Sequence, residues 1–429
     1  MAVANMQNSA GTNSAPGSSQ PVALSVMTTL FFMWGFVTVL NDVLVPHLKS
    51  IFDLNYTKVM LIQFAFFSAY FIFSIPSAKV IDWIGYKKTI IVGLVTMGIG
   101  ALLFVPAASV PSFPLFLGAL MVLAAGITAL QVAANPYVAV LGPPQTASSR
   151  LNLVQAFNSL GTTIGPYVGG LFILSATATN MDTVRQMSAD ALQAYRIHEA
   201  SSVKVPYLII GFLLFALAVV IALFKLPPIA DAHKHGDTKS GESLWKHRHL
   251  VLGAVGIFVY VGAEVSIGSF LINYFGQPEI GNLTAAVAAR YVAYYWGGAM
   301  VGRFIGSAVL QKVRTGTVLG LAALAACLLV STSMLTFGSV AMWTIILVGF
   351  FNSVMFPSIF TLGIAELGTL TGDGSGLLVM AIVGGAIIPV IQGALADRIG
   401  IHHAFVLPII CYLYIAFYAF KGSKPTVTA

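Results

Sequence analysis

The sequence predicts an all-α membrane protein whose twelve transmembrane helices form two six-helix halves. Only 8% of its 429 residues are charged and 58% are hydrophobic, whereas a soluble domain carries about 25% charged residues. Apolar stretches of about twenty residues, long enough to cross a ~30 Å hydrocarbon core as a helix, recur along the chain. A weak internal repeat relates the first six stretches to the last six. We therefore expect a polytopic helical bundle embedded in a lipid bilayer.

Twelve apolar spans follow one another along the chain, each predicted to within about three residues. They lie at 24–46, 60–80, 89–106, 112–140, 151–174, 204–226, 248–276, 284–310, 316–336, 341–366, 374–396 and 402–420. No stretch shows the alternation of polar and apolar residues that marks a membrane β-barrel, so all twelve are expected to be helices.

Polar segments divide the chain into parts. Residues 1–23 are rich in Ser, Asn and Gly and lack the basic start of a signal peptide, so we expect a disordered tail. Residues 227–247 read as a cytoplasmic linker between a first bundle at 24–226 and a second at 248–420, which a tail at 421–429 follows. His233 and His235 of the linker lack a second cluster of ligands, so neither a metal nor another cofactor is expected.

The distribution of Lys and Arg predicts the orientation. With the N-terminus inside, thirteen of these residues fall in inner segments, seven fall in outer loops, and the remaining one, Arg303, lies within a span. Cytoplasmic segments carry the excess of positive charge in membrane proteins. We therefore expect a multi-pass protein of the bacterial inner membrane with both termini in the cytoplasm.

The fourth and tenth spans carry the internal repeat. In the fourth span Gln131 precedes Pro136 by five residues, and Leu-Gly follows at 141–142. In the tenth span Asn352 precedes Pro357 by five residues, and Leu-Gly follows at 362–363. Matched proline-broken helices in two half-chains are typical of transporters that bind substrate between the halves. So short a match can also arise by chance.

Glycines at four-residue spacing mark two further spans that are equivalent under the repeat. The fifth span has Gly161, Gly165 and Gly169, and the eighth has Gly298, Gly302 and Gly306. Such spacing makes a flat face that another helix can approach closely. We interpret these faces as sliding surfaces between the two halves, although static bundles use them too.

Only two acidic residues lie well inside spans, Asp42 in the first and Glu264 in the seventh. A carboxylate in hydrocarbon is costly by about 2.5–3.5 kcal/mol on insertion scales, so such groups face a cavity or a partner. Burial favours the neutral form of a carboxyl group, which suits it to take up and release protons. With Arg303 these acids form a candidate cation-coupling set. The alternatives are a structural Glu264–Arg303 ion pair and an Asp42 that caps a loop.

Neutral polar and aromatic side chains on several spans form a candidate substrate-binding set. Amides offer both donors and acceptors to hydroxyl groups, and aromatic rings stack on apolar ligand faces, a mixture that suits a neutral sugar. For any single member an interhelical hydrogen bond remains an alternative. The set consists of Asn41, Gln131, Asn135, Gln155, Asn158, Asn273, Tyr295, Trp296 and Asn352.

Several function classes lack their sequence signatures. The chain has no GxxxxGK[ST] motif for nucleotide binding and no HExxH or GxSxG motif of a hydrolase, so we do not expect an enzyme. No basic run is interleaved with aromatic residues, so nucleic-acid binding is not expected. The two cysteines, Cys327 and Cys411, fall in apolar runs and are expected to be packing residues.

The segment 78–88, AKVIDWIGYKK, resembles the loop signature of the major facilitator superfamily, with Ala78 where a glycine is usual. Asp82, Gly85, Lys87 and Lys88 are its candidate gating residues, because a carboxylate at a helix end and flanking lysines can latch one conformation. The motifs LNDVLVPHL, LIQFAF, QVAANPYVAVLGP, RLNLVQAFNSLG, YVGAEVSIGSFL, GRFIG and FPSIFTLGI resemble the fucose:proton symporter family, and best its bacterial glucose/galactose branch.

This resemblance covers about residues 28 to 410 and implies alternating access with uptake of a neutral hexose and a cation. It implies a coupling role for Asp42, and it places Gln155 and Asn158 on a polar face of the fifth helix. Fucose members use a glutamate where this chain has Gln131, so Glu264 is a candidate replacement.

We expect a secondary active importer of glucose or galactose coupled to H+, working as a monomer in the lipid bilayer. Alternatives within transporters are N-acetylglucosamine or fucose as the sugar and Na+ as the ion. A drug exporter and a non-transporting sensor are the rival classes, and the amide-rich set argues against the broad apolar pocket of an exporter.

Overall fold

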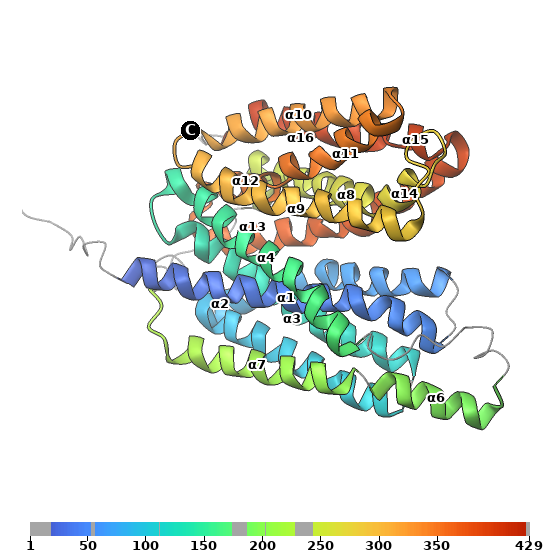
Figure 1. Cartoon of the computed structure of the whole chain (residues 1–429). Coiled ribbons are helices and arrows are strands. Elements are labelled where there is room, and N and C mark those ends of the chain that lie inside the picture. The colour runs from blue at the N-terminus through green and yellow to red at the C-terminus, as the bar shows by residue number, and fades with distance from the viewer. Residues whose placement is uncertain are drawn as a thin grey trace, which may run out of the picture.

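The computed structural model describes residues 19–52, 56–110, 112–173, 187–201, 203–227 and 243–425. Every regular element of these residues is helical (Figure 1). The side chains of 40–52, 56–61 and 166–173 lie outside the description, so Asn41 and Asp42 are placed only as residues of a helix. Of the expected linker and tails, residues 1–18, 228–242 and 426–429 likewise lie outside the described residues.

The first half of the chain contributes long helices joined by short connections. Its elements are α1 (Ser19–Phe52), α2 (Tyr56–Ser109), α3 (Phe113–Val140), the 3-10 turn η1 (Pro144–Thr146), α4 (Ala147–Ile173), α6 (Ala189–Ser201) and α7 (Lys204–Leu223). Helix α1 begins five residues earlier than the expected first span. Proline at the first turn of α3 suits a helix start, because its missing N–H would have no intrahelical partner there.

The second half contains more interruptions within its spans. Its elements are η2 (Leu244–Lys246), α8 (Arg248–Phe275), α9 (Ala285–Val309), α10 (Thr315–Leu335), α11 (Gly338–Asn352), α12 (Met355–Gly363), η3 (Gly368–Leu370), α13 (Thr371–Met380), η4 (Ala381–Val383), α14 (Gly384–Ile399), α15 (Ile401–Ala404), α16 (Val406–Phe417) and the π-turn η5 (Tyr418–Gly422). The tenth expected span is thus α11 and α12, which break just before Pro357. The eleventh is η3 to α14.

The prediction of twelve helical spans is confirmed. Within the described chain, nine helical stretches are long and apolar enough to cross a membrane. One of them, Ile62–Ser109, holds two spans, because Gly85 interrupts α2 with a φ of 79° that favours glycine. The less apolar helices α4 and α9 supply the remaining two.

Helix α6 is an addition that the apolar pattern did not predict. Its sequence, ADALQAYRIHEAS, has polar or charged side chains at six of thirteen positions, and it lies between α4 and α7 in the chain. It packs against α1, α2 and α7, and therefore belongs to the first half. A search for apolar spans does not detect this helix, because its thirteen residues are too few and too polar to cross a bilayer.

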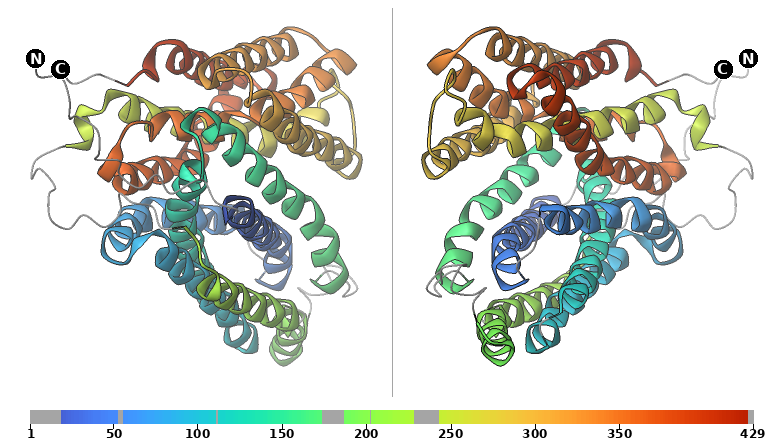
Figure 2. Two further views of the ribbon diagram at one scale, coloured as in Figure 1. Left: turned by 90° about the vertical axis from the view of Figure 1, so that its left-hand side faces the viewer. Right: turned by 90° about the vertical axis from the view of Figure 1, so that its right-hand side faces the viewer.

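The two halves form separate bundles that lie against each other (Figures 1 and 2). In Figure 1 the helices α1 to α7 occupy the lower body and α8 to α16 the upper one. The start of α1 and the end of the last helical segment, η5, lie on the same side. We call this side, which also carries the turn at Gly85 and the connections around residues 141–147, 310–315 and 363–371, the terminal face.

Hydrogen bonds and an ion pair join the halves near the terminal face. Lys79 Nζ of α2 lies 2.9 Å from Asp373 Oδ1 of α13. The Ser375 hydroxyl of α13 donates to the Val132 carbonyl of α3 at 2.7 Å. At a second contact between the halves, the Ser149 hydroxyl of α4 donates to the Ser307 carbonyl of α9 at 2.7 Å. The halves are thus held together at more than one point near this face.

The glycine faces pack mainly inside each half, so their interpretation as sliding surfaces between the halves is wrong for most of them. A Cβ on Gly161 would lie 2.3 Å from the Phe32 carbonyl of α1, and one on Gly302 would lie 2.5 Å from the Phe350 carbonyl of α11. Gly165 also faces α1, and Gly298 also faces α11. Only Gly306, among the described members, also approaches the other half, at Asn152 of α4. Glycine spacing marks a close approach but does not name the partner helix.

Candidate functional site

A polar cavity of about 140 Å³ lies between the two halves, about midway along the helices. Each half contributes to its wall: α3, which continues unbroken through Pro136, brings Gln131, and α12, which begins just before Pro357, brings that proline. The first half contributes Trp34, Gln131 and Gln155, and the second half contributes Tyr260, Val261, Glu264, Arg303, Phe356, Pro357 and Ile382. The expected location of the binding site, between the halves, therefore coincides with a cavity that both amides and aromatic rings line.

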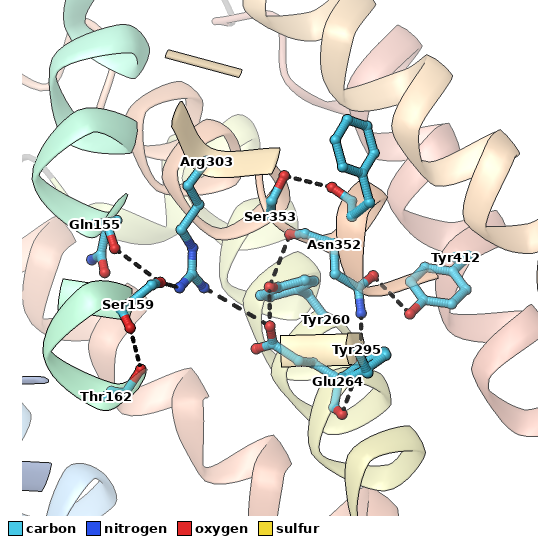
Figure 3. A network of polar contacts seen from close by, with 11 residues as sticks. Gln155, Ser159, Thr162, Tyr260, Glu264, Tyr295, Arg303, Asn352, Ser353 and Tyr412 are labelled. Atoms are coloured by element: carbon cyan, nitrogen blue, oxygen red, sulfur yellow. Dashed lines mark hydrogen bonds and ion pairs between the residues drawn. The ribbon is translucent and has the colours of Figure 1, made fainter. Parts of the chain in front are cut away.

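Glu264 and Arg303 are the charged residues of this cavity, and the structure brings them together (Figure 3). Glu264 Oε1 lies 4.0 Å from Arg303 Nη2, and the two side chains are only 13% and 16% exposed. Tyr260, one turn earlier on α8, donates its hydroxyl to Glu264 Oε1 at 2.8 Å. The carboxyl group therefore has a neutral donor in contact and a cation at the limit of ion-pair distance.

The Arg303 side chain also reaches the opposite half. Its Nη1 donates to the hydroxyl of Ser159 on α4 (Figure 3). The Ser159 hydroxyl in turn donates to the Gln155 carbonyl at 3.1 Å. Asn152, two turns earlier on the same helix, donates its amide nitrogen to the backbone carbonyl of Arg303 at 2.7 Å. Helix α4 thus holds Arg303 at both its backbone and its guanidinium group.

Asn352 is the centre of a buried hydrogen-bond network behind Glu264. Its amide nitrogen donates to the Tyr295 hydroxyl at 2.9 Å, and its amide oxygen accepts from the Tyr412 hydroxyl at 2.8 Å. Its backbone carbonyl accepts from Tyr260 at 3.0 Å. The Tyr295 hydroxyl lies 3.4 Å from the Glu264 carbonyl. This network fixes α8, which carries Glu264, against α9, α11 and α16, because each buried polar group in it has a partner.

On the side of the first half, Gln131 and Gln155 present amides to the cavity. Gln131 donates its amide nitrogen to the Tyr70 hydroxyl at 2.8 Å, and this bond orients the side chain. Gln155 is buried on α4 and shares the cavity wall with Trp34 of α1. These groups could donate to and accept from the hydroxyl groups of a ligand.

Other residues of the candidate substrate-binding set lie elsewhere. Asn158 donates to the Phe31 carbonyl at 2.9 Å and so links α4 to α1. Asn135 is fully buried on α3, one turn beyond Gln131. Asn273 is exposed near the end of α8. Trp296 is 44% exposed, and its ring packs against Gly268, one turn beyond Glu264. The substrate role of each of these residues stays a prediction.

The candidate gating loop lies on the terminal face. Asp82 Oδ2 is 3.5 Å from Lys79 Nζ, which also pairs with Asp373 of the other half. Gly85 supplies the sharp turn between two spans. Lys87 donates to the Ala222 carbonyl at the end of α7 at 2.8 Å, and Lys88 is exposed. The contact between the halves therefore runs through Lys79, which sequence reasoning did not include.

Sequence reasoning missed several members of the site, namely Tyr70, Ser159, Tyr260 and Tyr412. One signal could have found Tyr260, because it precedes Glu264 by four residues and therefore shares its helix face. A single serine or tyrosine within an apolar span has no comparable pattern. In the described residues, no three His, Cys, Asp or Glu side chains are grouped to hold a metal ion.

Comparisons with known proteins agree with this geometry. The family described as Major Facilitator Superfamily matches residues 22–382. A glucose/galactose transporter of Brucella abortus biovar 1 (strain 9-941) is 54% identical over 402 residues, which is 94% of each chain. A putative glucose/galactose transporter of Helicobacter pylori (strain J99 / ATCC 700824) is 46% identical over 414 residues, covering 95% of this chain and 98% of that protein.

The fucose symporters are more distant relatives. The L-fucose-proton symporter of Escherichia coli (strain K12) is 36% identical over 414 residues, again 94% of each chain. A solved structure, described as the Major Facilitator Superfamily transporter FucP in the outward conformation, has a TM-score of 0.89 at 36% identity and covers 95% of this chain and 100% of that one. The chain belongs to the Major Facilitator Superfamily, in the fucose:proton symporter family and its glucose/galactose branch.

Proposed function

We propose that this protein imports a neutral hexose of the glucose/galactose type together with a proton, by alternating access. The observation that carries the proposal is the cavity between the halves, where two amides and three aromatic rings line the same space as the Glu264–Arg303 pair. Amides and aromatic rings suit a sugar, and a buried carboxyl group suits a proton. The names of the relatives from Brucella abortus and Escherichia coli support the same sugar class and ion.

The proposed orientation places the terminal face in the cytoplasm, as the excess of Lys and Arg on that side predicts. Because the halves are joined near that face by Lys79–Asp373, Ser375 and Ser149, the cavity is reached from the opposite, outer side. The similarity to FucP in the outward conformation supports this assignment. Sugar and proton would therefore enter this conformation from outside the cell.

In the proposed cycle the sugar lies against Trp34 and bonds to the amides of Gln131 and Gln155. Glu264 takes up the proton, with Asp42 of α1 as the second coupling residue. Moving one charge across a 100 mV potential supplies roughly 2.3 kcal/mol, enough for about 50-fold accumulation. The protein binds sugar and proton in the same cavity. Both therefore cross the membrane when the halves close the outer side of the cavity and open its inner side.

Uptake by reconstituted vesicles tests the proposal. Purified protein in proteoliposomes is given radiolabelled glucose or galactose under an imposed pH gradient, and in parallel under a sodium gradient. We expect the pH gradient to drive accumulation, and Glu264→Gln and Asp42→Asn to abolish it while sugar exchange continues. Glu279→Gln is the matched control, because Glu279 is exposed in the connection between α8 and α9. Normal accumulation by both Glu264→Gln and Asp42→Asn would reject the coupling residues, and accumulation driven by sodium alone would reject the proton.

Competition by unlabelled sugars tests the substrate. Glucose, galactose, fucose and N-acetylglucosamine are added in turn to the exchange assay. We expect glucose and galactose to compete best. Stronger competition by fucose or N-acetylglucosamine would move the specificity away from the glucose/galactose type.

A further inference from the structure

Arg303 lies between two acceptors that belong to different halves of the molecule. Its guanidinium group donates to Ser159 of α4 in the first half and lies 4.0 Å from the carboxylate of Glu264 in its own half (Figure 3). The bond to the hydroxyl is direct, whereas the ion pair is at the limit of the distance at which such pairs are recognised. In this conformation Arg303 therefore interacts more closely with the other half than with the acid beside it.

The position of Ser159 makes it a well-directed acceptor. Its hydroxyl proton is used in the bond to the Gln155 carbonyl, so its lone pairs point away from its own helix and remain for Arg303. The bond from Asn152 to the Arg303 backbone fixes α9 against α4, two turns before Ser159. Further along, the Thr163 hydroxyl lies 3.6 Å from Met300 Sδ, where α4 and α9 still touch. Helix α4 therefore holds Arg303 at two points, and the Ser159 bond is the one that involves its charge.

The charge of Glu264 decides which acceptor Arg303 prefers. An ionised carboxylate attracts a guanidinium group through its full negative charge, whereas a protonated carboxyl group offers only a neutral acceptor, as the Ser159 hydroxyl does. The titratable and charged groups around Glu264 are Tyr260 on its own helix, Arg303 and Tyr295 on α9, and Tyr412 on α16 behind Asn352. Arg303 is the only cation among these described neighbours, so it is the group that responds to the proton.

We propose that Arg303 is a proton-dependent link between the halves, bound to Ser159 when Glu264 is protonated and drawn to Glu264 when the proton leaves. Ser159 is thus a positioning residue for proton coupling and does not itself contact sugar or proton. The inference rests on the proposed function and adds to it the means by which the proton reaches the other half. Loading Glu264 leaves the Arg303 guanidinium group bound to Ser159, and unloading it breaks that one bond between α4 and α9.

The pH dependence of sugar exchange in proteoliposomes tests the link. Ser159→Ala removes the acceptor, so Arg303 is free to close on Glu264 and to favour its ionised form. We expect the midpoint of the pH profile to move by about one pH unit toward acid, because a closer cation favours the carboxylate. Ser159→Thr keeps the hydroxyl and should restore the wild-type midpoint. Ser149→Ala is the matched control, since Ser149 joins the same two helices through Ser307 without contacting the Arg303 guanidinium.

The outcomes separate this inference from the proposed function. An unshifted midpoint in Ser159→Ala, or an equal shift in Ser149→Ala, would overturn the link while leaving proton-coupled uptake intact. A threonine variant that behaves like the alanine variant would also overturn it, provided that purified protein elutes as a folded monomer. A pH profile that persists unchanged in Glu264→Gln would instead reject the coupling role of Glu264, and with it the proposed function.

Discussion

At the scale of single residues, Asn352 shows how a polar side chain in a membrane span can serve the structure around a site. Its amide bonds to two tyrosines, Tyr295 and Tyr412, and its carbonyl bonds to a third, Tyr260. All four residues are buried. Because Tyr260 and Tyr295 also contact Glu264, the network transmits any change at Asn352 to the coupling site.

We expect Asn352→Ala to destabilise the protein, because it removes the acceptor of the Tyr412 hydroxyl and the donor that bonds to the Tyr295 hydroxyl. Each unsatisfied buried hydroxyl costs about 1–3 kcal/mol. The midpoint of thermal unfolding of the detergent-purified protein should fall by several degrees. Asn273→Ala is the control, since Asn273 is exposed and should leave the midpoint unchanged. Equal midpoints for the two variants would contradict the structural role of Asn352.

At the scale of elements, close backbone contacts hold each half together. Gly35 of α1 lies so near α4 that a Cβ there would be 2.1 Å from the Asn158 carbonyl. Gly161 makes the reciprocal approach from α4 to α1. The same helices are tied by the bond from Asn158 to Phe31. The helix pair therefore moves as one body, and both helices carry cavity residues.

We expect Gly35→Ala to lower the yield of folded protein sharply, because the added methyl group would collide with backbone atoms that cannot give way. Gly118→Ala on α3 is the control, since a Cβ there meets no atom within 4 Å. Alanine favours a helix over glycine by up to about 1 kcal/mol, so the control should be neutral or slightly stabilising. Size-exclusion profiles of the two variants give the measurement. A monodisperse Gly35→Ala protein at wild-type yield would refute the close approach.

The sequence predicted some elements well and others poorly, for physical reasons. Long apolar spans are unmistakable in hydropathy, and acids within them are rare enough to single out Glu264. Helix α6 escaped notice because its polar sequence resembles a loop. The glycine spacing in α4 and α9 predicts that another helix packs closely there, but it does not indicate which helix that is. Ser159 could not be found, since a hydroxyl gains its role only from the arginine that another helix brings to it.

At the scale of the whole molecule, the conformational equilibrium depends on contacts at the terminal face. The Lys79–Asp373 ion pair joins the halves directly, and its side chains are 50% and 24% exposed. An exposed pair is worth only about 0.2–1 kcal/mol. Such a weak contact can favour one conformation without locking it, as a transporter that must alternate requires.

We expect Asp373→Lys to open the terminal face more often, by about two- to five-fold, because it places like charges opposite each other and removes a pair of that strength. The measurement is the rate at which a thiol reagent modifies a cysteine at Ala78, which is buried there, after replacement of Cys327 and Cys411. Adding Lys79→Glu to Asp373→Lys should restore the wild-type rate. A rate that ignores both changes would show that this pair does not hold the face closed.

The attachment of α6 to α1, α2 and α7 gives experimenters a handle on the motion. Because α6 packs against the first half, a fluorescent dye on its exposed Gln193 would move with the first half. A second dye on Gln277, which is exposed just after α8, would move with the second half. Energy transfer between the two dyes would then report the separation of the two halves in real time, without altering any residue that lines the cavity.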